Sequence, residues 1–558
     1  MSNFKKIIMK RFCLYSLILL TLFSCEDALD FVQDGELNDE ALFTSVDNMQ
    51  LVLNEVYDDV RLNVINEQEV GSRLTDEVAI GDAEFPGGTH SFQVFSTNAF
   101  AENIWQTKYF AIDRANRLIR GAGLFTPPDE DIVEYNNILA QARAIRAFCH
   151  FQLLTYFSPD ISNDDSEFGV MISREVQSPQ TDLPRSTVGE VFTFIEEDLD
   201  FASANLTNPT SGAGSYNFFN TNIIDAMRAR MYLYRENYNL AEQFADNLIN
   251  NSGIELASCT GPLPENFPLT SDETSQIGAE GSTSFDTPPP ATSEIQRALF
   301  QMDRSAVGFP IAPDYRLMWI DAIQGEVIYS MPRANNDGNY ISIYNTNQSY
   351  TGGAPLLDMG RNLYELFTEP LGGGAQDFRR WCFVDRSSTI AANPTTATRG
   401  SEVIVIDKYP GKSGSHSAND EKIFRMSEMY FIKAECRVEA GDLSGAADLI
   451  QEVRQARNYI AGATVPTPNY ANIQEAYADV LLERNKELCF EGHRYIDLNR
   501  IGPKAGVQET NRFETDSENS GATNPFNISV TDYRFTLPIP QDELNVNTNN
   551  MFQNPGYN

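Results

Sequence analysis

The stretch Ala229–Leu248, ARMYLYRENYNLAEQFADNL, decides the fold, because it predicts two helices joined by a short polar turn at Glu236–Asn239. Small and apolar residues recur at helical spacing on both sides of this turn, at Ala229, Leu233, Ala241, Phe244, Ala245 and Leu248. Ala229 and Ala241 are 12 positions apart, so two small side chains lie at matching heights on the two helices. Two antiparallel helices can therefore approach closely here.

A second stretch, 205 residues further along the chain, repeats the pattern. It is Ala434–Val453, AECRVEAGDLSGAADLIQEV, and its turn lies at Gly441–Asp442. The corresponding positions are Ala434, Val438, Ala446, Leu449, Ile450 and Val453. The spacing, with Tyr232 in the first copy, resembles a tetratricopeptide helix pair. That repeat has a small residue where Leu248 and Val453 stand here, so another kind of amphipathic helical hairpin is the alternative. Either way, helix pairs form the scaffold.

The rest of the chain divides into helical and non-helical parts. Helical periodicity covers residues 47–62, 104–119, 132–157, 187–205 and 473–490. It fails between about 251 and 420, where Gly, Pro, Ser, Thr and Asn are frequent and β-like runs occur at Glu326–Met331 and Glu402–Ile406. The sequence thus predicts a mostly α fold, a tetratricopeptide-like helix-pair scaffold with a large loop-rich insertion that carries short β-strands.

Composition and charge exclude several classes of protein. The 558 residues are 42% hydrophobic, which is ample for a core, and the formal charge is 41 − 78 = −37. Such a surface repels a phosphate backbone, so we expect no nucleic-acid partner, whereas a neutral ligand such as a sugar is compatible. The seven cysteines are scattered and contain no CxxC pair, so neither a disulfide framework nor a zinc site is predicted.

The N-terminus predicts a lipoprotein signal peptide at residues 1–24. A basic start precedes the apolar run Phe12–Phe23, which is too short to span a bilayer and is typical of a secretory signal. Leu22-Phe23-Ser24-Cys25 resembles a bacterial lipobox, in which Cys25 is acylated; a plain signal peptide with an incidental cysteine is the alternative. Glu26 and Asp27 resemble the acidic run of surface-exported lipoproteins of Bacteroidota, so we expect a cell-surface protein anchored by lipid in the outer membrane.

Four further segments carry a family resemblance. They are Arg143–Phe157 (RAIRAFCHFQLLTYF), Asp420–Glu435 (DEKIFRMSEMYFIKAE), Glu483–Arg500 (ERNKELCFEGHRYIDLNR), and the C-terminal LPIP and QNPGY at 537–540 and 553–557. In this order, after a lipobox, they resemble the SusD/RagB family of outer-membrane nutrient-binding lipoproteins. The resemblance implies one domain over 25–558, with a helical body at about 40–250 and 421–502, a ligand-binding insertion at about 251–420 and a C-terminal segment at 503–558.

The segment Glu483–Arg500 is interpreted as structural. Its charges fall at helical spacings, with Glu487 and Glu491 set against Arg494, and Gly492 is expected to end one helix and begin the next. His493 and the carboxylates are expected to tie two helices together through buried hydrogen bonds. No HExxH or GxSxG motif occurs, and the partial phosphate-loop and calcium-loop patterns lack required residues. We therefore expect no catalytic residue, metal or cofactor.

Aromatic faces that stack on sugars, flanked by polar side chains that bind hydroxyls, are the residue types a glycan site needs. Two loop stretches supply them: Asp82, Phe85, His90 and Phe92 (with Phe95 and Asn98), and Tyr315, Arg316, Trp319, Arg333, Asn335, Tyr340 and Tyr344 (with Asn336, Asp337 and Tyr350). The resemblance implies that the two stretches lie near one another on one face. The alternative is that Trp319 and some of the phenylalanines form the core of the insertion.

The function implied by the resemblance is capture of an oligosaccharide or polysaccharide and its delivery to a TonB-dependent transporter of the SusC type. The implied partners are this transporter, the glycan, and the outer membrane through the lipid anchor. A peptide-binding member of the same family is one alternative. A surface lipoprotein glycosidase is another, because any of the 78 acidic residues could form a catalytic carboxylate pair.

Overall fold

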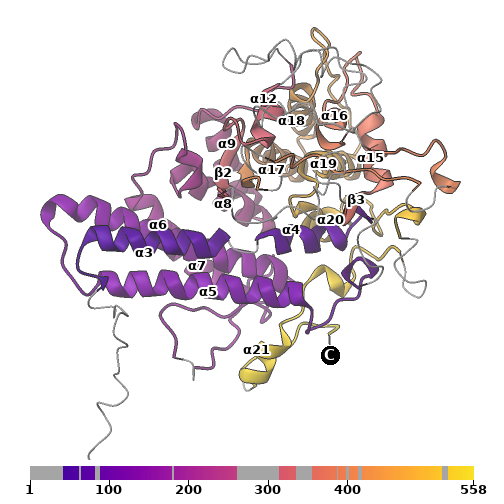
Figure 1. Ribbon diagram of the computed structural model, residues 1–558. Coiled ribbons are helices and arrows are strands. Elements are labelled where there is room, and N and C mark those ends of the chain that lie inside the picture. Colours follow the sequence, from indigo (N-terminus) through magenta and orange to yellow (C-terminus); the bar gives the residue numbers. More distant parts are fainter. Residues whose placement is uncertain are drawn as a thin grey trace, which may run out of the picture.

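The computed structural model describes residues 42–61, 64–81, 88–178, 181–260, 313–334, 355–385, 388–396, 401–411, 418–517, 526–548 and 550–557. Within these ranges the chain is mostly helical, with a few short strands (Figure 1). The predicted fold class is confirmed. Cys25 lies outside the described residues, so the signal peptide and the lipid anchor stay predictions. No helix in the described ranges has the length and apolar character needed to cross a membrane.

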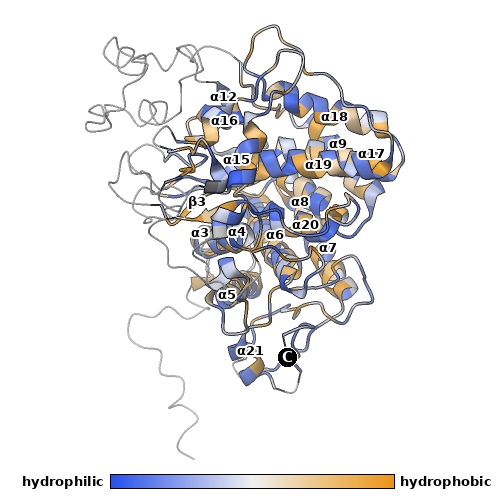
Figure 2. Ribbon diagram, turned by 90° about the vertical axis from the view of Figure 1, so that its right-hand side faces the viewer, coloured by the Kyte–Doolittle hydropathy of each residue, from blue (hydrophilic) through white to orange (hydrophobic). Residues whose placement is uncertain are grey.

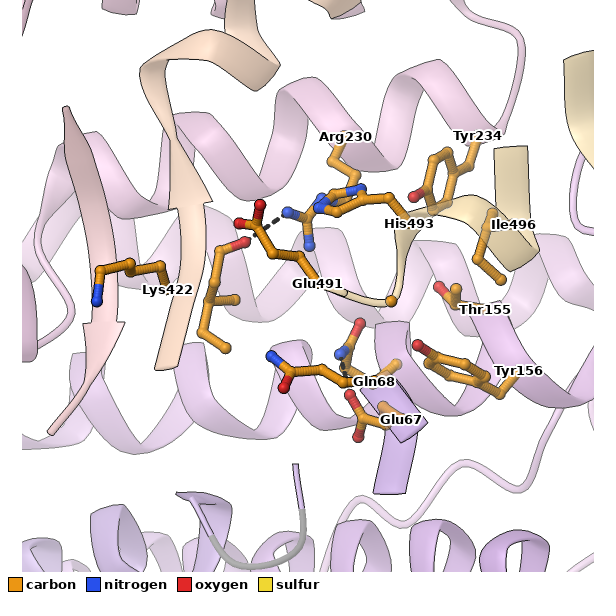
Figure 3. A pocket seen from close by; sticks show the side chains of 13 residues that line it. Glu67, Gln68, Thr155, Tyr156, Arg230, Tyr234, Lys422, Glu491, His493 and Ile496 are labelled. Atoms are coloured by element: carbon orange, nitrogen blue, oxygen red, sulfur yellow. Dashed lines mark hydrogen bonds between the residues drawn. The ribbon is translucent and has the colours of Figure 1, made fainter. Parts of the chain in front are cut away.

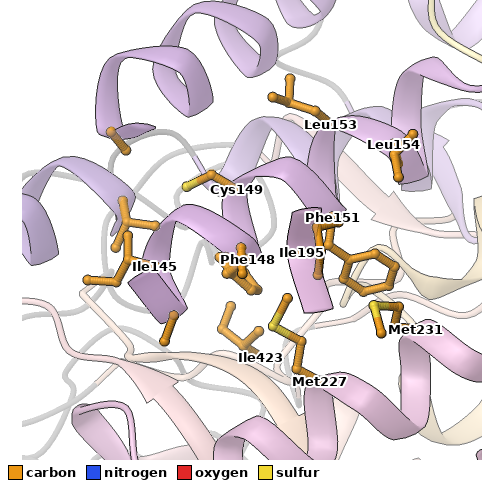
Figure 4. Packing of buried hydrophobic residues seen from close by; sticks show 14 of the residues in the cluster. Ile145, Phe148, Cys149, Phe151, Leu153, Leu154, Ile195, Met227, Met231 and Ile423 are labelled. Carbon is orange, nitrogen blue, oxygen red and sulfur yellow. The ribbon is translucent and has the colours of Figure 1, made fainter. Parts of the chain in front are cut away.

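The N-terminal half is a layer of long helices. It consists of α3 (Val46–Arg61), α4 (Val64–Arg73), α5 (Ala99–Ala122), α6 (Ile132–Phe157) and α7 (Val188–Asn205). In Figure 1 α3, α5, α6 and α7 run side by side, and α6 contacts each of the other three. Helix α6 is buried on all sides from Ala144 to Leu154, because it passes through the main hydrophobic core. Figure 4 shows Phe148 and Phe151 of α6 packed with Met227 and Met231.

The two predicted helix pairs are confirmed. They are α8 (Thr221–Tyr234) with α9 (Tyr238–Asn251), and α17 (Met426–Glu439) with α18 (Leu443–Ala456). Every helix boundary in the second pair lies 205 residues after its counterpart in the first, as do the capping residues Asn237 and Asp442. The pairs lie next to each other through α9 and α17, where Arg437 bonds Glu242 at 2.6 Å. Helices α19 (Ile473–Leu488) and α20 (His493–Ile501) follow the second pair, and α19 packs on α17 and α18 (Figure 2).

The predicted insertion has its own hydrophobic core, which includes Tyr315, Trp319, Phe378 and Phe383. Around it lie the short helices α12 (Asp314–Trp319), α15 (Arg361–Thr368) and α16 (Arg379–Phe383). Two antiparallel strand pairs join this core to the body: β1 (Val78–Ile80) with β3 (Leu357–Met359), and β2 (Val327–Met331) with β4 (Glu421–Arg425). The boundaries expected near residues 251, 421 and 503 stay a prediction.

One expected strand is wrong and one is confirmed. Strand β2 lies within the β-like run at 326–331. The run at 402–406 forms only isolated bridges, in which Val403 pairs with Thr389 and Ile406 pairs with Val384. Its β-branched residues fit an extended backbone, but among the described residues opposite only the single positions Val384 and Thr389 pair with it.

Candidate ligand-binding surface

The two predicted ligand-binding stretches are anchored at one sheet edge. Ile80 of β1 pairs with Leu357 of β3, and the backbone N–H of Gly81 donates to the carbonyl of Leu356 at 2.9 Å. A Cβ at Gly81 would lie 2.1 Å from the carbonyl oxygen of Pro355, so only glycine permits this approach. Gly81, which precedes residues 82–87, and Pro355, which follows residues 335–354, are therefore neighbours in space although they are far apart in sequence.

The second anchor of residues 335–354 lies at the end of β2. Nη2 of Arg333 donates to Oε1 of Glu421 at 2.7 Å, and its backbone N–H donates to Oδ1 of Asp420 at 2.8 Å. The same guanidinium also bonds the carbonyl of Arg61, at the end of α3. Burial raises the pKa of Glu421 to about 7, although Arg333 acts in the opposite direction. Arg333 thus fastens three segments together and is 5% exposed.

A third anchor lies beside the second. The amide of Asn419 donates to the carbonyl of Trp319 at 2.8 Å, while its oxygen accepts from the backbone N–H of Gly411 at 2.6 Å. Asp321 accepts from Nζ of Lys422 at 2.6 Å and from the backbone of Asp420 at 2.8 Å. Residues 412–417 therefore leave the described structure close to the end of β2.

The structure corrects the expectation that the candidate side chains are exposed on loops. Six of the eleven main candidates are described, and all six are buried: His90, Phe92, Tyr315, Arg316, Trp319 and Arg333. The other five lie outside the described residues, so their role stays a prediction: Asp82, Phe85, Asn335, Tyr340 and Tyr344. Of the further candidates, Phe95 is 60% exposed and Asn98 caps α5 by accepting from the backbone of Phe100.

Trp319 is the clearest example of this correction. Its indole is fully buried, with Nζ of Lys408 and Nζ of Lys422 at 4.7 and 5.2 Å from the ring centroid. Tyr409 and Phe383 pack edge-to-face against it, at 5.6 and 6.0 Å. The indole face that the sequence analysis expected to stack on a sugar is therefore covered by the protein's own cations and rings. The alternative, in which Trp319 is core of the insertion, is confirmed.

His90, Phe92 and Arg316 are equally enclosed. Nε2 of His90 lies 3.1 Å from the carbonyl oxygen of Val78, and burial lowers the pKa of this imidazole well below its usual range, with Arg512 adding to the effect. The guanidinium of Arg512 covers the ring of Phe92 at 4.1 Å. Nη2 of Arg316 donates to Oδ2 of Asp407 at 2.7 Å inside the insertion core.

A buried ionic network under the insertion centres on Glu487. Its carboxylate accepts from Arg457 at 2.8 Å, from Arg425 at 2.9 Å, from Arg379 at 3.1 Å and from the hydroxyl of Tyr315 at 2.9 Å. Burial opposes ionisation, but Arg457 and Arg425 outweigh it and hold the pKa of Glu487 well below its usual range. Arg457 and Arg425 also bind Glu326, so α19 is tied to the loop before β2.

The expected pairing within Glu483–Arg500 is wrong. Arg494 bonds Asp76, not Glu487 or Glu491, while Glu491 accepts from Lys408 and Arg425. The expected role of Gly492 is confirmed in part: with a φ of 84° it begins α20 as the N-cap residue, but α19 already ends at Leu488. The side chain of His493 makes no hydrogen bond to the described residues, which corrects its expected part in tying the helices.

An exposed aromatic group missed by the sequence analysis lies beside the second anchor. Phe218 follows the 3₁₀ turn Ser215–Asn217, is 46% exposed and packs edge-to-face on Tyr57 at 5.2 Å. The hydroxyl of Tyr57 donates to Gln141 at 2.8 Å and accepts from the backbone of Phe219 at 2.9 Å, so this aromatic pair is held rigidly. The signal in the sequence is SYNFFN at 215–220, three aromatic and two amide residues between two helices.

These features make one surface, which we call the anchor surface: Tyr57, Arg61, Tyr216, Phe218, Asp321 and Asp420. Arg61 lies one turn after Tyr57 on α3 and donates to the carbonyl of Pro332 at 3.0 Å. Tyr216 is half-buried, and burial raises the pKa of its hydroxyl, with Asp420 and Asp321 adding to the effect. Partly exposed rings flanked by the Asp420 carboxylate and the Arg61 guanidinium can stack on sugar C–H faces and bind hydroxyls.

No group of three or more His, Cys, Asp or Glu side chains within the described ranges could hold a metal ion. The buried carboxylates of the Glu487 network are instead bound by arginines. The fold and this surface define a helix-pair protein with a loop-bearing face.

Comparison with known proteins identifies the family. A family model described as "SusD family" matches residues 385–557, and one described as "Starch-binding associating with outer membrane" matches residues 29–233. The chain belongs to the SusD/RagB family, as its sequence motifs imply. It is similar to the "SusD-like protein P2" of Formosa agariphila, with 24% identity across 97% of this chain and 99% of that protein.

Solved structures share the fold. A SusD superfamily protein from Bacteroides thetaiotaomicron superposes with a TM-score of 0.66 and 21% identity, over 92% of this chain and 100% of the other. A "Laminarin binding SusD-like protein" superposes with a TM-score of 0.58 and 19% identity, over 92% of this chain and 99% of the other.

Proposed function

We propose that this protein is a cell-surface glycan-binding lipoprotein, not an enzyme, which captures an oligosaccharide or polysaccharide at the anchor surface. The observation that carries the proposal is the placement of the chain on either side of residues 82–87 and 335–354. One end of each adjoins the backbone contact between Gly81 and Leu356, and the other end of 335–354 adjoins Arg333, which bonds Arg61 of the anchor surface. The family description of starch binding and the laminarin-binding structural neighbour support a glycan ligand. Capture needs only stacking and hydrogen bonds, and a chain with 78 acidic residues against 41 basic ones favours a neutral glycan.

Delivery is the second part of the proposal. Acylation of Cys25 would hold the protein on the outer membrane, and a SusC-type TonB-dependent transporter would receive the glycan and supply the vectorial step. We expect Cys25→Ala to move the protein out of the outer-membrane fraction. We also expect cells that carry this variant to take up less labelled glycan, although the purified soluble protein binds it normally. Normal membrane retention of Cys25→Ala would contradict the anchor.

The binding experiment uses soluble protein that starts after Cys25. Affinity electrophoresis and calorimetry over laminarin, starch and other neutral polysaccharides, with alginate as a polyanion, measure retention. Chromatography of the same samples measures released sugars. We expect retardation by a neutral glycan without smaller products. Released products would instead establish a glycosidase, and retention by peptides alone would favour the peptide-binding alternative.

A matched pair of variants tests the place of binding. Phe218→Ala removes the exposed ring, and we expect it to weaken binding by about 1 kcal/mol, or about fivefold. Phe110→Ala is the control, because Phe110 is exposed to a similar degree (48%) on α5 and also packs against one neighbour, Arg114. Equal effects of both variants would place the glycan elsewhere.

A further inference from the structure

A polar cavity lies inside the helical body, between the C-terminal ends of α6 and α8 and the length of α20. Its outer chamber, of ≈ 210 Å³, opens beside the exposed residues Asp160, Ser162 and Glu236. Its inner chamber, of ≈ 40 Å³, reaches Gln68 and His493. Thr155, Tyr234 and Ile496 line both chambers, so the two are adjacent. We call this space the interhelical cavity.

Several neutral polar groups face the cavity without a partner among the described residues. In the outer chamber, Oγ of Ser158 is unbonded although the residue is only 6% exposed. In the inner chamber, Oε1 of Gln68 is unbonded in a residue that is 3% exposed. Figure 3 shows Tyr234 and His493 across the chamber from Gln68. Buried polar groups without partners are costly, so this arrangement favours a polar occupant.

The charged groups of the cavity are already matched by other side chains. Arg230 is bound by both carboxylate oxygens of Glu428, at 2.6 and 2.7 Å, and Glu491 is bound by Lys408 and Arg425. Burial, with Arg230 and Arg484 nearby, lowers the pKa of His493 well below its usual range, so its imidazole is neutral. The unmet hydrogen-bonding capacity is therefore that of the Ser158 hydroxyl, the Gln68 amide oxygen, the Tyr234 phenol, the neutral His493 imidazole and one N–H of Arg500. Nε of Arg500 has no partner among the described residues, although Glu435 and Asp497 bind its other two nitrogens.

The volume of the outer chamber and its apolar lining residues restrict the class of ligand further. The outer chamber is smaller than the range of about 300–1,000 Å³ common for drug-sized ligands, so it does not fit an oligosaccharide. Ile161, Ile496 and Phe535 line it and offer contacts to C–H groups. The inner chamber has room for water only.

From these observations we propose that the interhelical cavity binds one neutral, monosaccharide-sized polyol, at a site distinct from the anchor surface. The ligand would occupy the outer chamber, exchange hydrogen bonds with Ser158 and Tyr234, and contact the inner groups through water. The choice of a sugar as the ligand depends on the proposed glycan-binding function. The existence and the polarity of the cavity do not depend on it.

The test is calorimetry of the soluble chain with D-glucose, D-galactose, D-mannose, L-fucose and D-xylose. We expect saturable binding of at least one sugar with one site per chain. Ser162→Trp, at the exposed mouth, should weaken it by about tenfold or more. Ser444→Trp is the control, because Ser444 is an exposed serine at the start of α18. A crystal structure with the bound sugar should place it between Ser158 and Tyr234.

Several outcomes would overturn the proposal. One is the absence of saturable binding for all five sugars, and another is a cavity that holds ordered water only. A third is sugar binding that survives Ser162→Trp but is lost in Phe218→Ala, because this would place the sugar at the anchor surface. Failure here is distinguishable from failure of the proposed function, since polysaccharide retention is measured separately and depends on Phe218.

Discussion

Arg494 and Asp76 form a buried two-pronged ion pair that joins α20 to the segment between α4 and β1. Nε and Nη2 of Arg494 donate to the two carboxylate oxygens of Asp76 at 2.7 and 2.8 Å. Burial opposes ionisation of Asp76, but Arg494 outweighs it and lowers the pKa of the carboxyl. The motif near the C-terminus thereby holds the strand from which residues 82–87 leave.

Loss of this pair should cost much more than loss of a surface pair. Arg494→Met leaves the buried carboxylate of Asp76 without its main counter-ion, so we expect the free energy of unfolding to fall by about 3–5 kcal/mol. Arg174→Met is the control, because its 2.7 Å pair with Glu197 is half-exposed and should cost about 1 kcal/mol or less. Thermal unfolding measures both. The double variant Asp76→Asn/Arg494→Met should recover part of the loss, and failure to recover any would contradict an ionic origin.

The two helix pairs differ at one turn position in a way that can be tested. Glu236 and Gly441 stand 205 residues apart at equivalent positions, with φ of 56° and 76°. Side chains disfavour this left-handed region by about 1–2 kcal/mol, so Gly441→Ala should lower stability by about 1 kcal/mol. Glu236→Gly should raise it or leave it unchanged, because its exposed bond to Lys504 contributes little. Comparison of the melting temperatures checks both, and the opposite order would refute the equivalence.

The contribution of Glu77 to stability should fall as the pH rises from about 5 to 8. Burial raises the pKa of Glu77 to about 7 in the folded protein, although Ser72 and the backbone of Phe490 donate hydrogen bonds to it. Below the ordinary pKa of a glutamate, folded and unfolded chains are both protonated. Between that value and 7 only the folded chain keeps the proton, so its contribution to stability is lost as the pH rises through this window. Glu77→Gln should reduce the slope of melting temperature against pH.

Gly81→Ala should weaken glycan binding with little effect on the helical body. The new Cβ would meet the carbonyl oxygen of Pro355 at 2.1 Å and separate the ends of β1 and β3. Gly123→Ala is the control, because its Cβ would approach a backbone atom only to 3.3 Å and it lies at the end of α5. Affinity electrophoresis measures binding, and circular dichroism checks helix content. Unchanged retention by Gly81→Ala would argue against a role of residues 82–87 and 335–354 in glycan binding.

Trp319→Ala should lower the free energy of unfolding, and any loss of glycan affinity should follow from this loss of stability. A fully buried indole removed from the insertion core is expected to cost about 3–5 kcal/mol, and Trp319→Phe should restore part of this. Melting temperature and glycan affinity are measured on the same samples. A large loss of affinity at an unchanged melting temperature would show that the indole contacts the ligand after all.

The sequence by itself determined the helix pairs, their turns and the repeat of 205 residues. Helical spacing, polar turns and capping residues such as Asn237 and Asp442 act between neighbours along the chain, so they are visible without a structure. The motifs that identify the family are equally local. Residue type and position in loop-like stretches mark candidate ligand residues, but neither reports burial.

Only the tertiary structure decided which side chains are exposed and which charges pair. Trp319 and Phe218 are both aromatic residues outside the long helices, yet the first is enclosed by Lys408 and Lys422 and the second faces solvent. Arg494 has carboxylates one turn away along its own segment but bonds Asp76, 418 residues distant. Burial and ion pairing depend on how remote segments pack, because desolvation and Coulomb energy follow distance in space and not separation in sequence.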